Sequence, residues 1–365
     1  MNNMSTILLV LFSIIALMVL HEFGHFIVSK WFKVKVDEFG VGYPPRIFGK
    51  KIGETVYSLN LLPFGAFVKI AGEEGEKSIN SSQNFNGKPI WQRSLIILGG
   101  VVSFWMIAVI ILSFVFSSGI SQVVSDEEEE GFSNPKIQVL SVASGSPAEL
   151  AGIEIGDTIL GFSAASVFYP VSKIKDVQEF TENYKGKEVV ASMKRGVEDF
   201  EISLVPRVSP PEGEGAMGVS LIRTAEKSYP IWMAPGLAIK ETINLTGAVI
   251  VGWGDTLLSL VKGQGLPSGV QFMGPVGMGS ILNDAAKVGI NYFLNIIAIL
   301  SIYMAVMNLL PIPALDGGRL LFLAIEKIKR SPINPKIEQN VNSAFFYLLV
   351  ALMVWVTIKD IGNLF

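Results

Sequence analysis

The sequence of 365 residues contains no cysteine and only two histidines. Without cysteine, disulfide bonds and thiolate metal sites are excluded, so a bound transition metal must be held by His, Asp or Glu. Charged residues make up only 17% of the chain, and the net charge of −3 gives no sign of a nucleic-acid partner. Half of the residues are apolar, and the mean hydropathy is +0.48. This composition favours a polytopic membrane protein over a soluble globule.

Four apolar stretches are long enough to cross a bilayer, which requires about 20 residues each. They cover about residues 6–28, 95–116, 288–310 and 344–361. A further stretch, 231–262, is interrupted by Lys240, Glu241 and Asp255. We expect it to form a helix in the membrane interface, with a fifth span as the alternative. The fold class is therefore a polytopic α-helical membrane protein with four transmembrane helices.

Both histidines lie in the first apolar stretch, within His21-Glu22-Phe23-Gly24-His25. In a helix, residues four apart share one face, so both imidazoles can bind one metal ion. Glu22 lies one position round the helix, where it can act as a general base on a metal-bound water, the nucleophile of zinc metalloproteases. Ionisable residues at membrane depth are costly, which argues against a chance match to this H-E-x-x-H pattern. A cleaved signal peptide is the alternative, but the stretch has no basic leader and no small-residue cleavage site.

A catalytic zinc site needs a third protein ligand, and the end of the third span supplies a candidate in Asp316. Asp316 should lie at the same depth as the two histidines, which favours a metal ligand over an exposed aspartate at a helix terminus. Asn308, eight residues earlier, can donate a hydrogen bond to a developing oxyanion. The segment 308–318 also contains two prolines, which break the helix, and two glycines, which allow a neighbouring backbone to approach closely. These residues are Pro311, Pro313, Gly317 and Gly318.

Basic residues flank the spans unevenly, and this asymmetry predicts the orientation in the membrane. Lysines and arginines gather in segments 30–94 and 312–343, whereas the second span is followed by the acidic run 126–130. We therefore expect the first two segments in the cytoplasm and residues 118–287 outside. The chain should cross the inner (cytoplasmic) membrane, with the histidine motif toward the cytoplasmic side.

The segments between the spans predict two regions with β-structure. Residues 54–59 and 65–70 are rich in β-formers and indicate a membrane-associated β-hairpin region within 39–71. This hairpin is either an ordinary cytoplasmic one or one that dips toward the active site and pairs with an extended substrate. Residues 135–207 alternate strand-like runs with a short helix that begins at Ser146 and Pro147, and indicate a small α/β domain.

The two motifs together, H-E-F-G-H and N-x-x-P-x-P-x-L-D-G-G, resemble the signature of the site-2 proteases, which are intramembrane zinc metalloproteases of peptidase family M50. The chain looks most similar to the bacterial RseP-type branch. The resemblance implies one zinc ion held by His21, His25 and Asp316, with Glu22 as the catalytic residue. It also implies cleavage within or beside the transmembrane helix of a single-span substrate, such as an anti-sigma factor or a remnant signal peptide.

Residues 146–159 resemble the core of a bacterial PDZ domain, which in this family is implied to exclude uncut substrates. Many RseP-type members carry two such domains in tandem, and only one is visible in this sequence. No loop for a peptide carboxylate can be placed in it, so its groove and ligand stay unassigned. The expected domains are a membrane part, an acidic linker, the PDZ domain, an interfacial segment and a second membrane part, at residues 1–117, 118–134, 135–207, 208–287 and 288–365.

Two other classes of protein share parts of this pattern. A zinc transporter also buries His and Asp in its spans, but it needs a polar path across several helices, and the second and fourth spans offer almost none. A silent membrane scaffold that presents a PDZ domain is the other alternative. The intact Glu22 argues against the scaffold, because a silent relative can lose the base without harm to folding.

Overall fold

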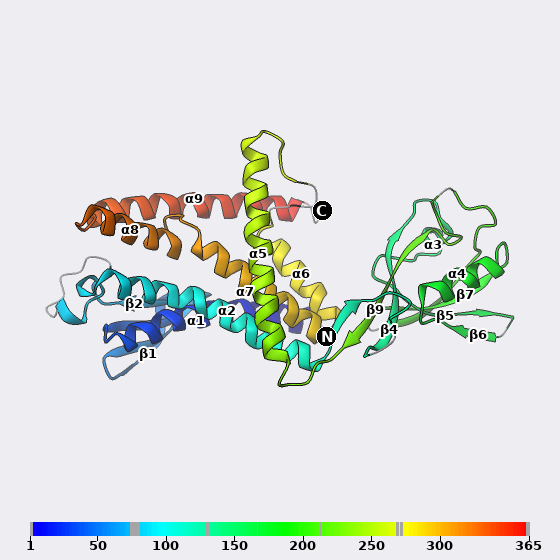
Figure 1. The fold of residues 1–365 in the computed structure, drawn as a ribbon, viewed down its shortest axis with the longest axis horizontal. Coiled ribbons are helices and arrows are strands. Elements are labelled where there is room, and N and C mark those ends of the chain that lie inside the picture. The colour runs from blue at the N-terminus through cyan, green and yellow to red at the C-terminus, as the bar shows by residue number, and fades with distance from the viewer. Residues whose placement is uncertain are drawn as a thin grey trace. The chain divides into compact units, whose positions relative to one another are not determined.

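The computed structural model describes residues 3–73, 81–128, 131–165, 167–196, 198–211, 213–267, 270 and 273–362. Glu129 and Glu130, at the end of the predicted acidic run, lie outside the described residues. The chain divides into two compact units. The first, which we call the helical unit, combines Met1–Ser113, Pro235–Ala286 and Phe293–Phe365. The second, the sheet unit, combines Phe114–Ala234 and Lys287–Tyr292 (Figure 1).

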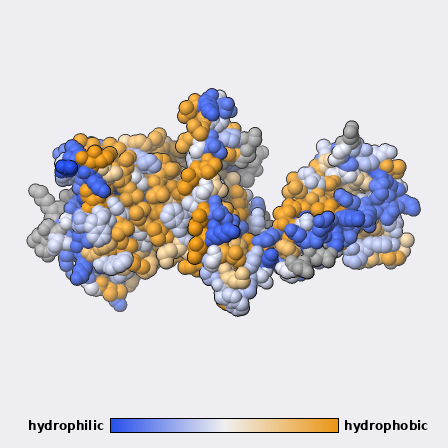
Figure 2. Space-filling view, in the orientation of Figure 1, coloured by the Kyte–Doolittle hydropathy of each residue, from blue (hydrophilic) through white to orange (hydrophobic). Residues whose placement is uncertain are grey.

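Within the described residues, five helices are long and apolar enough to cross a membrane: α1 (Asn3–Trp31), α2 (Ile90–Ser118), α5 (Ala234–Val261), α7 (Ile290–Leu309) and α9 (Pro335–Gly362). Four of them coincide with the predicted spans. The fifth helix, α5, also has the length and composition of a membrane span, so the predicted number of four transmembrane helices is not confirmed. Large apolar side chains point outward along these helices, for example Met106 at 60% and Trp355 at 59% exposure. Figure 2 shows such residues covering much of the visible face of the helical unit, as expected of a surface in contact with lipid.

The helix α5 is one continuous element of 28 residues, although Lys240, Glu241 and Asp255 interrupt its apolar sequence. Lys240 and Asp255 are exposed. In Figure 1, α5 runs across α7 and α9, whereas α2 runs in much the same direction as α9. The direction of α5 therefore differs from that of α2 and α9.

The third span begins later than the predicted residue 288, because a separate helix precedes it. This helix, α6 (Pro275–Val288), is divided from α7 by Gly289, whose φ of +151° is accessible to glycine but rarely to other residues. Asp360 of α9 accepts hydrogen bonds from the backbone N–H groups of Gly274 and Gly277, at 2.9 and 2.8 Å. The carboxylate thus caps the N-terminus of α6 and fixes it to α9.

The predicted β-region is present as a sheet of β1 (Val36–Ile52) and β2 (Thr55–Ile70). Residues 38–41 pair with 66–69 on one side and with 56–59 on the other, and residues 46–52 pair with 55–60. The two long strands therefore provide four paired runs, with 46–52 and 66–70 outermost. The sheet packs against α1 through aromatic rings; those of Phe26 and Phe39 have their centroids 5.6 Å apart.

The core of the helical unit lies where α1, α2 and α7 meet. Leu17 of α1, Phe104 of α2 and Phe293 of α7 are among its buried residues. A hydrogen bond of 2.8 Å runs from Ser301 Oγ of α7 to the Phe104 carbonyl of α2. After α7 the chain turns at Pro311 and Pro313 into α8 (Asp316–Lys329), which brings Asp316 back toward this core.

The sheet unit contains a seven-stranded sheet in the order β3-β9-β4-β5-β7-β8, with β6 paired to β5. Its strands and helices are β3 (Ile120–Val123), β4 (Ser133–Val142), α3 (Pro147–Leu150), β5 (Thr158–Ala164), β6 (Val167–Pro170), α4 (Ile174–Asn183), β7 (Val189–Arg195), β8 (Glu198–Leu204) and β9 (Val219–Lys227). The predicted helix start is confirmed, since Ser146 Oγ accepts the Glu149 N–H at 3.1 Å.

The predicted domain 135–207 covers only part of this sheet. On one side, β3 and the start of β4 fall in the segment 118–134, which we expected to be a solvated linker. On the other side, β9 falls in 208–287, which we expected to be interfacial, yet it lies between β3 and β4. These two boundaries were wrong because both strands pair with partners distant in sequence, which local sequence patterns do not reveal.

Candidate metal centre

The two histidines lie on one face of α1, as their spacing predicts. Their Nε2 atoms are 3.3 Å apart, and both side chains are buried. His25 Nδ1–H donates to the Ile96 carbonyl of α2 at 2.9 Å, which leaves Nε2 of His25 as the ring nitrogen with a free lone pair. The ring of His21 stacks on Phe104, with centroids 4.5 Å apart. These contacts hold both imidazoles with their Nε2 atoms directed at a common point.

Asp316 approaches the same point from the first turn of α8. Its Oδ2 lies 3.3 Å from Nε2 of His21 and 3.5 Å from Nε2 of His25, and its side chain is buried. The three atoms therefore form a triangle with sides of 3.3 to 3.5 Å. Tetrahedral zinc with bonds of about 2.0–2.1 Å requires ligand atoms about 3.3–3.4 Å apart. The donor set and its spacing fit a zinc ion.

Hydrogen bonding gives a second indication that this cluster accommodates a cation. Among the described residues, the buried Oδ2 of Asp316 and the buried Nδ1 of His21 have no hydrogen-bond partner of acceptable geometry. A buried acceptor without a donor costs about 1–3 kcal/mol, more if it is charged. A bound cation removes this cost at Asp316, because the carboxylate oxygen then has a positive partner.

Glycines of α2 and α1 make room for the cluster. A β-carbon at Gly100 would collide with the ring of His25 and lie 2.6 Å from Cε1 of His21. A β-carbon at Gly99 would lie 2.8 Å from the carbonyl oxygen of Gly24. The two helices therefore approach through small residues, as is common within membranes, and this approach brings α2 against the imidazoles. The sequence did not lead us to Gly100, although a glycine pair inside an apolar span was its visible signal.

The loop between α7 and α8 brings Asp316 into place. A β-carbon at Gly317 would lie 2.5 Å from the Leu309 carbonyl carbon, and one at Gly318 would lie 2.7 Å from Cα of Pro313. Gly317 thus permits α8 to pack directly on the end of α7, and Gly318 permits it to pack on the loop that follows. These distances are consistent with the expected close approach of a neighbouring backbone.

Glu22 and Asn308 lie outside the triangle of ligand atoms. Glu22 is half-buried on α1, and its charge, after the larger effect of burial, raises the pKa of Tyr43 on β1. The amide of Asn308 donates from Nδ2 to the Met304 carbonyl at 3.0 Å, within its own helix. The structure thus shows Asn308 bonded to α7, not directed at the cluster.

Comparison with known proteins agrees with this geometry. The family described as Peptidase family M50 matches residues 9–352. Two clostridial proteins and one from Agrobacterium fabrum, each named "Putative zinc metalloprotease", are similar over almost their whole length. The protein of Clostridium perfringens is 36% identical over 97% of this chain and 98% of its own. The protein of Clostridium acetobutylicum is 31% identical over 94% of this chain and 94% of its own. The protein of Agrobacterium fabrum is 26% identical over 95% of this chain and 93% of its own.

The family match covers both halves of the metal cluster, from the histidine motif of α1 to the aspartate of α8. The alternatives of a transporter and a silent scaffold are not supported, since the relatives are named as metalloproteases. With several apolar helices of membrane-spanning length, the chain is a multi-pass membrane protein. It is a zinc-dependent metalloprotease and belongs to peptidase family M50, the site-2 protease family.

Proposed function

We propose that this protease cleaves a peptide bond within or next to a transmembrane helix of a single-span membrane protein. One observation carries the proposal: the cluster of His21, His25 and Asp316 is buried among apolar helices of membrane-spanning length. A peptide bond must therefore be brought to the depth of these helices to reach it. Anti-sigma factors and remnant signal peptides are substrates of this kind.

The roles of the residues follow from their chemistry and position. His21, His25 and Asp316 would hold zinc, which when bound supplies an activated water and polarises the scissile carbonyl. Glu22, beside His21 and outside the ligand triangle, accepts a proton during attack and delivers one to the leaving amine. Asn308 lies on the helix that leads to Asp316. Its amide would have to leave the Met304 carbonyl in order to donate to the oxyanion.

The β1–β2 sheet is the proposed support for the unwound substrate. A helical substrate hides its peptide bonds in its own hydrogen bonds, so it must become extended before attack. The outer runs 46–52 and 66–70 each leave one edge without a strand partner within the described residues. An extended segment that pairs with such an edge keeps its backbone hydrogen bonds while one bond is exposed to the site.

The proposed orientation in the membrane is the one that the distribution of basic residues predicts. With segments 30–94 and 312–343 in the cytoplasm, the metal centre lies toward that side and the sheet unit lies outside. The helix α5 would then lie in the outer interface of the membrane. Its exposed Lys240 and Asp255, and its course across α7 and α9 in Figure 1, support this arrangement over a fifth span.

The sheet unit is proposed to be a PDZ-like domain that selects substrates. Its support is the arrangement of β9 and α4, which border a groove of about 470 Å³. A peptide that adds to the edge of a sheet beside a helix is a common form of recognition. A domain of this kind can admit substrates that have already been cut on the outer side.

The proposed function is tested with purified protein in vesicles and a single-span substrate labelled on both sides of its helix. Cleavage should occur within or beside the helix, stop with a zinc chelator and return when zinc is restored. A soluble peptide that matches only the loop outside the span serves as the control. Cleavage of that peptide at the same rate as the spanning substrate would contradict intramembrane specificity.

A further inference from the structure

The edge of β9 that faces away from β4 is only partly occupied. The strand β3 pairs with residues 224–227 on this edge, and the Val124 N–H donates to the Arg223 carbonyl at 3.0 Å. Backbone groups alternate in direction along a strand, so the N–H and C=O of Val219 and Leu221 point to the same edge as those of Arg223. No strand of the described residues pairs with them there. The edge is thus open over 219–222.

The open edge forms one wall of the groove, and α4 forms the other. Apolar and small polar side chains line it, among them Ile174, Val177, Thr181, Met217 and Leu221. At one end lies the loop 213–218, in which Gly218 has a φ of +77°. Among the described residues, the N–H groups of Met217 and Val219 have no backbone acceptor at this end. These donors favour a negatively charged group, such as the carboxylate at the end of a peptide.

The other end of the groove is closed by the chain itself. Arg223 is only 5% exposed, and its guanidinium donates to the carbonyls of Ser125, Glu128 and Ser172, at 2.6, 3.0 and 2.9 Å. Asp126 accepts the N–H groups of Ile174 and Lys175 at the start of α4, at 3.0 and 2.9 Å. We call these two side chains, Asp126 and Arg223, the clasp. It fixes the segment after β3 to both walls of the groove.

The direction of β3 decides what the groove can accept. Because β3 runs antiparallel to β9, its last residues point along the open edge toward Val219. A peptide that pairs antiparallel with Val219 and Leu221 would lie in line with β3, with its C-terminus at the loop 213–218. Its upstream residues would meet Val124 after about four residues, at about 3.3 Å per residue. A parallel peptide would place its positive N-terminus against backbone donors, which is unfavourable.

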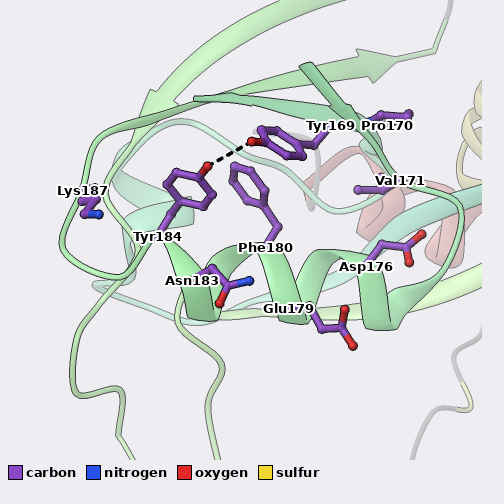
Figure 3. A pocket seen from close by; sticks show the side chains of 9 residues that line it. All are labelled: Tyr169, Pro170, Val171, Asp176, Glu179, Phe180, Asn183, Tyr184 and Lys187. Atoms are coloured by element: carbon purple, nitrogen blue, oxygen red, sulfur yellow. Dashed lines mark hydrogen bonds between the residues drawn. The ribbon is translucent and has the colours of Figure 1, made fainter. Parts of the chain in front are cut away.

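The helix α4 is fixed in place as a wall of the groove, because the face that points away from the groove packs against aromatic side chains of the sheet unit. The Phe180 ring stacks on Phe162 of β5 with centroids 4.6 Å apart, and it packs against Tyr169 of β6 with centroids 5.3 Å apart. Figure 3 shows Tyr169 and Tyr184 meeting near Phe180, with their hydroxyl groups 3.2 Å apart. The groove therefore has one wall fixed by aromatic packing and one end fixed by the clasp.

We propose that the clasp is a length stop, which restricts the groove between β9 and α4 to the last few residues of a peptide with a free C-terminal carboxylate. The proposal rests on the proposed role of the sheet unit in substrate selection. It makes the groove specific for a chain end, because an internal segment would have to continue through either the loop 213–218 or the clasp. A single-span substrate whose N-terminus is cytoplasmic presents such an end once it has been cut on the outer side.

The test measures binding of fluorescent peptides to the full-length protein in detergent. Peptides of four, six and eight residues share the C-terminal sequence Ser-Leu-Ala-Val, and each is made as a free acid and as an amide. The three acids should bind within about twofold of one another, and each amide should bind at least about tenfold more weakly. The same series is measured with Asp126→Ala, and with Glu127→Ala as the matched control. Glu127 is exposed and lies next to the clasp residue.

In Asp126→Ala, the affinity for the eight-residue acid should rise several-fold above the affinity for the four-residue acid, because residues 124–128 are no longer held to α4. An unchanged four-residue affinity shows that this variant is folded. The length stop is overturned if the eight-residue acid already binds the unaltered protein several-fold more tightly than the four-residue acid, or if Asp126→Ala gives no gain. If no acid binds at any length, the groove itself is refuted and this proposal with it, while the metalloprotease assignment stands.

Discussion

Gly100 of α2 faces His25 of α1 so closely that the ring of His25 occupies the place a β-carbon would take. The metal centre is therefore formed by three elements: α1 and α8 supply the ligand atoms, and α2 supplies a surface without a side chain. The same helix accepts a hydrogen bond from His25 through the Ile96 carbonyl. Helix α2 thus both positions the imidazole and leaves it room.

Gly100→Ala should impair the metal centre without harm to α2. Alanine is the better helix former, by about 1 kcal/mol, so the helix itself should not suffer. Its methyl group, however, must displace one or both imidazoles. Changes of this kind around metal ligands typically cost about 10–100-fold in metal affinity or activity. Zinc content and cleavage rate are the measurements.

The control for Gly100→Ala is Gly252→Ala, the same change in α5, where a β-carbon meets nothing within 4 Å. This control should keep full zinc content and full cleavage rate. Full zinc content and activity in Gly100→Ala as well would show that the close approach of α2 to His25 is unimportant.

One zinc ion per chain is expected, bound by His21, His25 and Asp316. Asp316→Ala should lower zinc occupancy, and His21→Ala or His25→Ala should lower it further. Elemental analysis of purified, folded protein gives the stoichiometry. A protein that is active without zinc, or that keeps its zinc when both histidines are replaced, would contradict this site.

The orientation is testable because the chain has no cysteine, so a single introduced thiol is the only one present. Ser144 and Ser82 are both exposed, in the sheet unit and in the segment before α2. In intact cells, Ser144→Cys should react with an impermeant thiol reagent, whereas Ser82→Cys should react only after lysis. The reverse pattern would move the metal centre to the outer side of the membrane.

The sheet unit can be removed at a position that the structure defines. The Tyr229 N–H donates to the Phe116 carbonyl at 2.8 Å, so the entering and leaving chains meet there. Replacing residues 120–227 by a short Gly/Ser linker should preserve cleavage of a pre-trimmed single-span substrate and increase cleavage of the untrimmed one. If both proteins discriminate equally between the two substrates, the sheet unit has a different task.

Local sequence patterns were sufficient to predict the metal ligands, but they were insufficient to predict the residues and strands that pack around them. The spacing of His21 and His25 predicts a shared helix face, and the break after α7 predicts a position for Asp316 at a matching depth. Gly100 could not be assigned in this way, because its role depends on which helix packs against α1. The strand β9 was missed for a similar reason, since it pairs with β4, about 80 residues earlier in the chain.

Glu22→Gln distinguishes catalysis from metal binding. Glu22 lies beside His21 but outside the ligand triangle, so its replacement should leave zinc content and fold unchanged. Glutamine has nearly the same size, but it cannot accept the proton that the mechanism requires. Loss of a general base typically costs about 10²–10⁴-fold in rate. Zinc content is measured beside cleavage of a single-span substrate.

The same variant should retain uncut substrate, because binding does not depend on the proton acceptor. Co-purification of intact substrate with Glu22→Gln, but not with His21→Ala, would show that the metal centre contributes to substrate binding while the base contributes to chemistry alone. The unaltered ligands and the hydrogen bond from His25 to α2 keep α1, α2 and α8 together in this variant. If Glu22→Gln cleaves as fast as the unaltered protein, the proton transfer belongs to another group and the mechanism proposed for this site is wrong.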